Sequence, residues 1–580
     1  MKNIIDKLHD LIYPPKTLPL DEAGSTFLGG VRLRDVPENI DEFYRLLFAR
    51  FRRRWGWMRW FGLNPSHFFS KERFVSYIEF QEGFTKRSGS FSELQNKFPI
   101  YKLVGLGNHT NQDDFIGAYK EKGLDGYFAL MRSKSPEMFN TFHEWHKAYL
   151  PKKEKGRHTY IIGRSGCGKS ELMKNIIIQD IAKNESSVIL IEPGHDLAEE
   201  IARQKGLDKN RLVYIDCSLT PATPVINPFE FIGDRTDVMA IEKQSQVIRD
   251  AIVQMSTANG QPLTQQMQSI LQPCLDIVMA RGGTLYDIQR FVDDDARNED
   301  LLELGKNHPK HGYFFEHRFN RSNLKASRDG IYQKLQEILN LSSVSGLFCG
   351  TSSIDLLKAI EEKKVIIFNL SKGHLGYYAS VYIGRLMVGI IQNLIFQRAT
   401  VDKKDRVPIN LYIDEFHDYI NKSVGEIFVQ GRRYKVDLTV ATQTVGQNMD
   451  SELANIVLSN TNIKFAGQND YKNTRTMSNE TGTELEVLQK LQVGDFLTRI
   501  SNANSFVLSA SSQHADDKTC ISRDEWKGIF EEQVKKYYRP RSEGERTPAP
   551  PKETTKPKEG KKRQKGQPEQ DGETFTPLYD

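Results

Sequence analysis

The sequence predicts an α/β fold with a mainly parallel sheet, and three observations support that prediction. From Arg157 onwards, short apolar segments alternate with segments that have helical periodicity. The apolar segments are rich in Val, Ile and Leu on both faces, as are parallel strands covered by helices. A glycine-rich loop joins the first of them to a helix. The predicted strands are residues 159–162, 187–191, 211–215, 364–370, 410–413 and 438–441.

Length and composition agree with a globular protein of several domains. The 580 residues suggest three or four domains at roughly 150 residues each. Hydrophobic residues make up 38% and charged residues 27%, which excludes a collagenous, wholly disordered or disulfide-stapled chain. The five cysteines are scattered without a C-x-x-C pair, so we interpret them as reduced structural thiols rather than a zinc site. The net charge of +5 is too small to indicate a partner.

No membrane-spanning helix is expected. No apolar run approaches the roughly 20 residues that such a helix needs. The nearest run, from Val381 to Phe396, is interrupted by Arg385 and Gln392. The N-terminal residues MKNIIDKLHD lack the apolar core of a secretion signal. We therefore expect a cytoplasmic location.

Residues 1–148 are predicted to form a small α+β accessory domain. Residues 73–80 and 100–106 have strand composition, and residues 90–98 have the pattern of a helix. Before them, the segment from Arg50 to Gly62 holds five arginines and three tryptophans. Such a segment suits peripheral contact with the inner face of the cell membrane, or with a phosphate backbone. An amphipathic helix packed on its own domain is the alternative.

The rest of the chain divides into four parts. Residues 149–235 and 346–540 are the two parts of the α/β domain, and residues 236–345 are predicted to be an all-α insertion between them. Residues 541–580 hold six prolines, nine basic and eight acidic residues but only two aromatics, so they cannot bury a core and are predicted to be a disordered tail. The helical stretches of the insertion are residues 238–255, 261–280 and 324–341.

The glycine-rich loop matches the pattern G-x-x-x-x-G-K-[ST] of a phosphate-binding loop. Glycines let the backbone curl so that successive N–H groups point at one phosphate, and the helix that follows adds its dipole. Lys169 would reach the β- and γ-phosphates, and the Ser170 hydroxyl would bind Mg²⁺. The sequence therefore predicts that ATP and Mg²⁺ bind here. The loop consists of Gly163, Arg164, Ser165, Gly166, Cys167, Gly168, Lys169 and Ser170.

Cys167 lies inside this loop, where a thiol has two interpretations. It is a small space-filling side chain, or it is a redox switch that controls nucleotide binding. The first interpretation is favoured.

Two carboxylates end the predicted strand 410–413. Phosphoryl transfer requires a carboxylate that holds Mg²⁺ near the P-loop hydroxyl, and a group that activates the attacking water. Asp414 suits the first role and Glu415 the second.

The predicted strand 438–441 carries two more candidates. Gln443 follows its end, where an amide could contact the γ-phosphate or its water. Arg432 precedes its start, and an arginine there could enter the site of a neighbouring subunit and stabilise transition-state charge. In a monomer Arg432 would instead lie at a helix end, where a cation opposes the dipole.

Six motifs stand in a specific order: GRSGCGKS, VILIEPGHDLAEEI, VINPF, VIIFNLSKGHLG, LYIDEF and GRRYKVDLTVATQ. In this order they resemble the FtsK/HerA superfamily of ring-forming DNA translocases. The resemblance covers about residues 150–520 and is closest to the TraG/TraD-type coupling ATPases of type IV secretion and conjugation.

This resemblance implies a RecA-like ATPase domain that assembles as a homo-hexamer and moves DNA through a central channel, contacting its backbone rather than its sequence. The all-α insertion matches the all-α domain of the coupling proteins. Residue by residue, the resemblance gives the P-loop roles to Lys169 and Ser170, the Walker B roles to Asp414 and Glu415, the sensor role to Gln443 and the arginine-finger role to Arg432.

Two features depart from the family. Coupling proteins usually carry N-terminal transmembrane helices, and none is expected here. Glu192 stands where the family more often has Asp, but the position stays acidic. The first departure favours a cytosolic motor, or one that a partner or the segment from Arg50 to Gly62 recruits to the membrane.

The sequence thus favours an ATP-driven DNA translocase that works with the proteins of a conjugation or type IV secretion machinery. Two alternatives stay open: a soluble HerA-like motor for DNA repair or packaging, and a non-translocating ATPase that energises protein secretion or assembly. A membrane-associated scaffold recruited through the segment from Arg50 to Gly62 is a third.

Overall fold

A computed structural model describes residues 24–32 and 145–540, together with isolated positions between 118 and 143. The gaps within the second range are residues 219–221, 231–234, 236, 258–261, 295–297, 421, 502–504 and 512–518. The elements predicted within residues 50–106 and the tail predicted at 541–580 lie outside the described residues.

The described residues contain a sheet of 11 strands whose central part is parallel. Its order is β2-β1-β12-β11-β10-β3-β9-β8-β4-β7-β5, and every pairing from β10 to β5 is parallel. All six predicted strands are present, which confirms the mainly parallel α/β fold. The parallel strands are β3 (Thr159–Ile162), β4 (Ser187–Glu192), β5 (Leu212–Asp216), β7 (Val365–Asn369), β8 (Ile409–Ile413), β9 (Val436–Thr442) and β10 (Ile463–Ala466).

Antiparallel strands extend one end of this sheet, and the sequence did not predict them. They are β1 (Thr26–Val31), β2 (His146–Leu150), β11 (Asp495–Ile500) and β12 (Phe506–Ala510). Gly29 of β1 pairs with Ala510 so closely that a Cβ at Gly29 would lie 2.1 Å from the Ser509 carbonyl oxygen. Strand β1 therefore pairs residues near the N-terminus with the α/β domain. A separate two-stranded sheet joins β6 (Ala222–Pro224) to β13 (Tyr538–Pro540).

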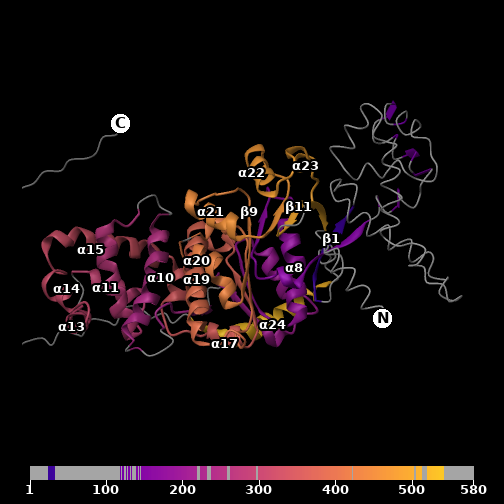
Figure 1. Cartoon of the computed structure of the whole chain (residues 1–580). Helices are drawn as coiled ribbons and strands as arrows, with labels where there is room; N and C mark the ends of the chain where they lie inside the picture. The colour runs from indigo at the N-terminus through magenta and orange to yellow at the C-terminus, as the bar shows by residue number, and fades with distance from the viewer. Residues whose placement is uncertain are drawn as a thin grey trace, which may run out of the picture. The chain divides into compact units, whose positions relative to one another are not determined.

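Both faces of the parallel sheet are buried, as the composition of the strands predicts. In β3, Tyr160 and Ile162 belong to one hydrophobic cluster and Ile161 to another. This alternation follows from the period of two along a strand. Helices α19 (Tyr377–Gln397) and α20 (Lys422–Gln430) supply the first cluster, whereas α8 (Lys169–Lys183) and α9 (Asp196–Ala202) supply the second. Figure 1 shows α8 and α19 on opposite sides of the strands.

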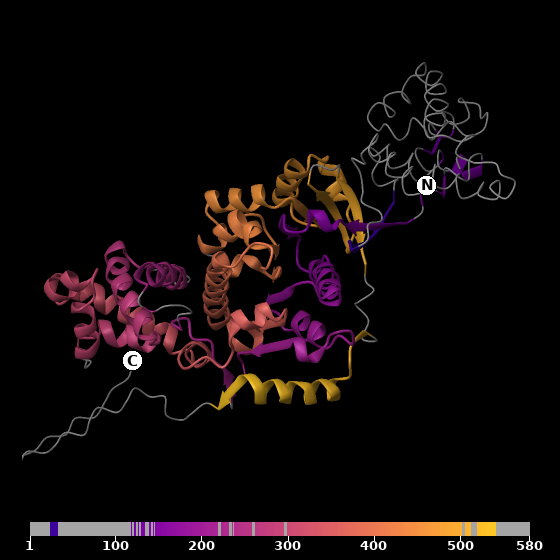
Figure 2. The ribbon, with the colours of Figure 1, turned by 60° about the horizontal axis from the view of Figure 1, so that its bottom comes forward.

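Further helices complete the described part of the α/β domain. Helix α24 (Arg523–Tyr537) packs its Trp526 against Tyr214 of the edge strand β5, with 5.2 Å between ring centroids, and Figure 2 shows this helix as a long yellow ribbon. The other helices are shorter: α17 (Leu356–Glu361), α18 (Lys372–Leu375), α21 (Ser451–Asn460), α22 (Tyr471–Thr481) and α23 (Leu485–Gln489).

Every regular element in the described residues of the predicted insertion is a helix, which confirms that it is all-α. Its longest helices match the three predicted stretches closely. They are α10 (Val238–Thr257), α11 (Gln265–Arg281), α12 (Leu285–Val292), α13 (Glu299–Lys306), α14 (Gly312–His317), α15 (Ser322–Leu339) and α16 (Ser342–Phe348).

One described helical segment, Tyr377–Thr400, is long and apolar enough to cross a membrane by length and composition alone. Its most apolar window is entirely buried inside the α/β domain. Arg385 within it donates hydrogen bonds to the carbonyl oxygens of Asp418 and Gln254, at 2.9 and 2.5 Å. Burial on all sides is typical of the core helices of globular proteins. The length and composition of this segment are therefore only weak evidence for a membrane span.

Acid should destabilise the α/β domain through His158, which precedes β3 and is only 2% exposed. Burial, with Arg432 nearby, lowers its pKa from 6.5 to about 4, while a backbone hydrogen bond at Phe428 opposes the shift. Because the unfolded chain binds the proton more readily, stability present above pH 6.5 is lost as the pH falls towards 4. We expect His158 to account for a loss of about 2 kcal/mol between about pH 7 and about pH 5.

The substitution that tests this role is His158→Asn, which removes the titrating ring. The Asn side-chain oxygen can replace Nδ1 as acceptor of the Leu438 N–H, and Asn tolerates the left-handed backbone at this position. Urea unfolding at both pH values should show less acid sensitivity in this variant than in wild type. His317→Asn, at an exposed position of α14, is the control. Equal acid sensitivity in all three proteins would contradict the role of His158.

Candidate nucleotide-binding site

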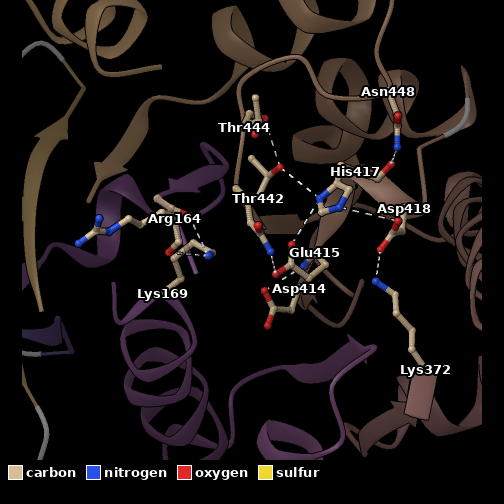
Figure 3. A network of polar contacts seen from close by, with 12 residues as sticks. Arg164, Lys169, Lys372, Asp414, Glu415, His417, Asp418, Thr442, Thr444 and Asn448 are labelled. Atoms are coloured by element: carbon tan, nitrogen blue, oxygen red, sulfur yellow. Dashed lines mark hydrogen bonds and ion pairs between the residues drawn. The ribbon is translucent and has the colours of Figure 1, made fainter. Parts of the chain in front are cut away.

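The phosphate-binding loop follows β3 and leads into α8, as the motif predicts. Gly166 and Gly168 have φ values of 77° and 100°, a backbone region that favours glycine. The Lys169 Nζ donates hydrogen bonds to the carbonyl oxygens of Gly163 and Arg164, at 2.8 and 3.3 Å. The ammonium group therefore lies within the curve of the loop (Figure 3), in front of the N-terminus of α8.

Ser170 and Asp414 are 244 positions apart in the chain and in contact in the structure. The Ser170 Oγ donates to the Asp414 Oδ2 at 3.3 Å, and the Glu415 N–H donates to the Oδ1 at 2.9 Å. Burial, together with the negative charge of Glu415, raises the pKa of Asp414. A hydroxyl and a carboxylate side by side are oxygen ligands of the kind that Mg²⁺ takes beside substrate phosphates. The two residues fit the predicted metal role.

Glu415 lies beyond the end of β8 in a left-handed backbone conformation, with φ of 45°. For a residue other than glycine such a conformation costs on the order of 1–2 kcal/mol. The Gln443 Nε2 donates to the Glu415 Oε1 at 2.8 Å. Among the residues that the structure describes, the buried Oε2 has no hydrogen-bond partner, and it lies 3.4 Å from the His417 Nδ1. One carboxylate oxygen is thus held, and the other is buried without a hydrogen bond.

Gln443 connects this acidic pair with the phosphate-binding loop. It directly follows Thr442, whose carbonyl oxygen accepts a hydrogen bond from the Gly163 N–H at 3.2 Å. The Gln443 carbonyl oxygen in turn accepts from the Asn469 Nδ2 at 2.7 Å. The structure therefore brings the predicted residues Lys169, Ser170, Asp414, Glu415 and Gln443 to one edge of the sheet. Their catalytic roles remain predictions.

A second layer of polar residues surrounds Glu415, and sequence reasoning missed it (Figure 3). His417 lies between Glu415 and Asp418, and burial lowers its pKa. The Asp418 Oδ2 pairs with the Lys372 Nζ at 2.5 Å. The Asn448 Nδ2 donates to the His417 carbonyl oxygen at 3.0 Å. The only sequence signal was that His417 and Asp418 directly follow the LYIDEF motif, and that Lys372 stands in the motif after β7.

Arg432 lies elsewhere, before the start of β9 in the 3₁₀ turn Gly431–Tyr434. Gln443 follows the other end of the same strand, so its seven residues separate the two by about 23 Å at 3.3 Å per residue. Arg432 lines a cavity of about 300 Å³ together with Lys155, Lys183 and Lys435. The structure does not bring Arg432 to the nucleotide site of its own chain.

Cys167 fills space inside the loop. It is 1% exposed, and a Cβ added to Gly163 would lie 2.4 Å from its Sγ. Burial is the main cause of a raised thiol pKa, which disfavours the reactive thiolate. These observations favour the space-filling interpretation over the redox switch.

Glu192 ends β4 and closes the turn into α9. Its two carboxylate oxygens accept hydrogen bonds from the Gly194 and His195 N–H groups, each at 2.6 Å. Burial, with the charge of Asp414 adding to it, raises the pKa of Glu192 to about 7. Its carboxylate therefore holds the backbone of this turn.

The loop, the acidic pair and the strand order define a P-loop ATPase. Residues 144–387 match the family model described as "Helicase HerA, central domain". This match confirms, for that part of the chain, the resemblance to the FtsK/HerA superfamily.

Several solved structures are similar at low identity, whereas no curated protein sequence matches this chain. The bacterial conjugative coupling protein TrwBΔN70, in an unbound form, is 12% identical with a TM-score of 0.48, and the match covers 63% of this chain and 87% of that one. VirB4 of Thermoanaerobacter pseudethanolicus is 14% identical with a TM-score of 0.43, over 61% of this chain and 89% of that one. The genome-packaging NTPase B204 of Sulfolobus turreted icosahedral virus 2 is 10% identical with a TM-score of 0.26, over 62% and 100%.

The contact between Gly163 and Cys167 predicts a rescue between two substitutions. Gly163→Ala should weaken the binding of a fluorescent nucleoside triphosphate about tenfold or more, because the added methyl group meets the Cys167 Sγ and distorts the loop. Gly163→Ala combined with Cys167→Ala should restore most of the affinity, and Cys167→Ala alone should bind like wild type. Fluorescence titration measures all four proteins. A double variant as weak as Gly163→Ala would contradict this packing.

Proposed function

We propose that this ATPase is an ATP-driven DNA translocase that serves conjugative DNA transfer or type IV secretion. The observation that carries the proposal is the separation of Arg432 from its own nucleotide site by the length of β9. An arginine placed there acts on the nucleotide of a neighbouring copy, as it would in the homo-hexamer that the family resemblance implies. The motor contacts the DNA backbone rather than its sequence, so its binding weakens as salt rises.

Hydrolysis requires ATP and Mg²⁺, and the residues of the site divide the work. Lys169 and the loop N–H groups would hold the phosphates, and the adjacent Ser170 and Asp414 would hold the metal ion. When bound, Mg²⁺ supplies positive charge against the charge that develops on the phosphoryl oxygens. Glu415 accepts a proton from the attacking water as the general base. Since Gln443 donates to this same carboxylate, its amide restrains Glu415, and the second N–H of the amide can donate to a phosphate oxygen or the attacking water.

The names of similar proteins support the choice of pathway. One is a conjugative coupling protein and another is VirB4, so proteins of a secretion or conjugation machinery are the proposed partners. The proposed location is cytoplasmic, with or without recruitment to the inner face of the membrane. A soluble HerA-like motor for DNA repair or packaging is the second candidate, because the family model is that of the HerA central domain. A non-translocating ATPase that drives protein secretion or assembly is the third.

DNA should stimulate the ATPase. We expect wild-type turnover to rise when single- or double-stranded DNA is added. Glu415→Gln should reduce turnover on the order of a hundredfold or more, since it removes the base while keeping the shape of the side chain. It should still bind nucleotide. Steady-state phosphate release with and without DNA tests both points. Turnover that no DNA changes would leave only the non-translocating ATPase.

Two inactive variants should complement each other. Lys169→Ala removes nucleotide binding but keeps Arg432, whereas Arg432→Ala keeps the P-loop and lacks the finger. In a mixture, an intact P-loop meets an intact Arg432 at some interfaces, so turnover should exceed the sum of the separate proteins. Turnover of the mixture against its composition measures this. A mixture no more active than its components, or only monomers in sedimentation with ATP and DNA, would contradict a finger acting between subunits.

A further inference from the structure

The loop that follows β7 carries an unusual exposed surface. It runs from Ser371 to Tyr378, contains the short helix α18 and ends in the first turn of α19. Strand β7 lies two strands from β8 in the sheet, so the loop begins about 10 Å from the acidic pair along the same edge. Neither the predicted site nor the proposed mechanism uses this loop.

Tyr377 and Tyr378 are each 49% exposed, although α19 is buried continuously from Ala379 to Phe396. Their rings stand edge to face, with 5.5 Å between centroids and 74° between planes. The Lys372 Nζ lies 5.8 Å from the centroid of the Tyr377 ring. The loop SKGHLGYY contains a lysine and a histidine but no acidic residue. Exposed rings beside positive charge are the means by which proteins bind unpaired bases along a phosphate backbone.

The same loop is linked to the catalytic residues through side chains. The Lys372 ammonium pairs with Asp418 at 2.5 Å, and His417, the residue before Asp418, lies 3.4 Å from the Glu415 Oε2. Beyond the end of the loop, Arg385 in the buried part of α19 donates to the Asp418 carbonyl oxygen at 2.9 Å. The exposed loop is therefore attached through Lys372 to the residue pair that contacts Glu415 (Figure 3), and the helix that follows the loop is attached to Asp418 through Arg385.

We propose that residues 371–378 form the single-stranded DNA contact of this motor, and that Lys372, Asp418 and His417 couple that contact to Glu415. This inference rests on the proposed DNA translocase. Tyr377 and Tyr378 stack on bases, which present a free flat face only when they are unpaired. Lys372 is one-third exposed and binds either a DNA phosphate or Asp418. DNA binding therefore changes the partner of Asp418 and, through His417, the surroundings of Glu415.

The test of the contact uses the full chain and a substitution of both tyrosines. With a non-hydrolysable ATP analogue present, Tyr377→Ala with Tyr378→Ala should bind a fluorescent oligodeoxythymidine about tenfold more weakly or worse, because two stacking surfaces are lost. Tyr377→Phe with Tyr378→Phe keeps the rings and should bind like wild type. Tyr313→Ala, at a 71% exposed tyrosine of the insertion, is the matched control. Turnover without DNA should be equal in all four proteins.

The test of the coupling separates affinity from turnover. Lys372→Ala should lose most of the stimulation by oligodeoxythymidine at saturating DNA. Without the lysine, DNA binding no longer changes the pairing of Asp418. Lys372→Arg keeps a cation and should retain the stimulation. A purely structural role for Lys372 would lower turnover with and without DNA by the same factor. That result would overturn the coupling.

The outcomes distinguish this inference from the proposed function. A wild-type protein that neither binds nor responds to any DNA overturns both. A wild-type protein that responds to DNA, with the double Ala variant equal to it, overturns only the DNA contact. If the double Ala variant loses affinity equally for oligodeoxythymidine and for a duplex, the surface binds DNA without base stacking, and the single-stranded assignment is wrong.

Discussion

The contact between Ser170 and Asp414 is the constraint on which the rest of the structure depends. It requires the start of α8 to meet the end of β8, although β9 separates β3 from β8 in the sheet. Only a parallel arrangement brings the ends of all three strands to one edge. Burial of both faces of the sheet fixes this arrangement, and it also removes Asp414 from water and raises its pKa. The apolar core thus makes the charged form of Asp414 costly unless a cation lies beside its carboxylate.

The central strands could be predicted from the sequence because their signal is local. β4 reads SVILIE and β8 reads INLYI, and such runs are buried on both faces in any parallel sheet. The antiparallel end carries no such signal. β1 contains Gly29 and Gly30, which disfavour a strand in isolation, and its partner β12 lies some 480 residues later. Its pairing depends on close backbone approach at Gly29, a property of the assembled sheet.

The same distinction holds for the site. The residues from Gly163 to Ser170 could be predicted because one continuous segment builds the whole loop. Asp414 and Glu415 could be predicted because phosphoryl transfer needs carboxylates at a strand end. Lys372, His417 and Asp418 could not, since their arrangement depends on contact between the loop after β7 and the turn after β8. A lysine in SKGHLG has no local feature that distinguishes it from any surface lysine.

Glu415 has two features that are unfavourable for the folded state. Its backbone is left-handed, and the second oxygen of its carboxylate is buried without a hydrogen bond from any residue in the described part of the chain. The left-handed backbone alone costs on the order of 1–3 kcal/mol. The hydrogen bond that the Gln443 Nε2 donates holds one oxygen of the Glu415 carboxylate in place. A carboxamide nitrogen carries two N–H groups, so the second N–H of Gln443 can donate to a γ-phosphate oxygen while the first stays on Glu415. In the proposed mechanism, a γ-phosphate that pulls on this amide therefore shifts the Glu415 carboxylate with it, and the amide connects the nucleotide directly to the base.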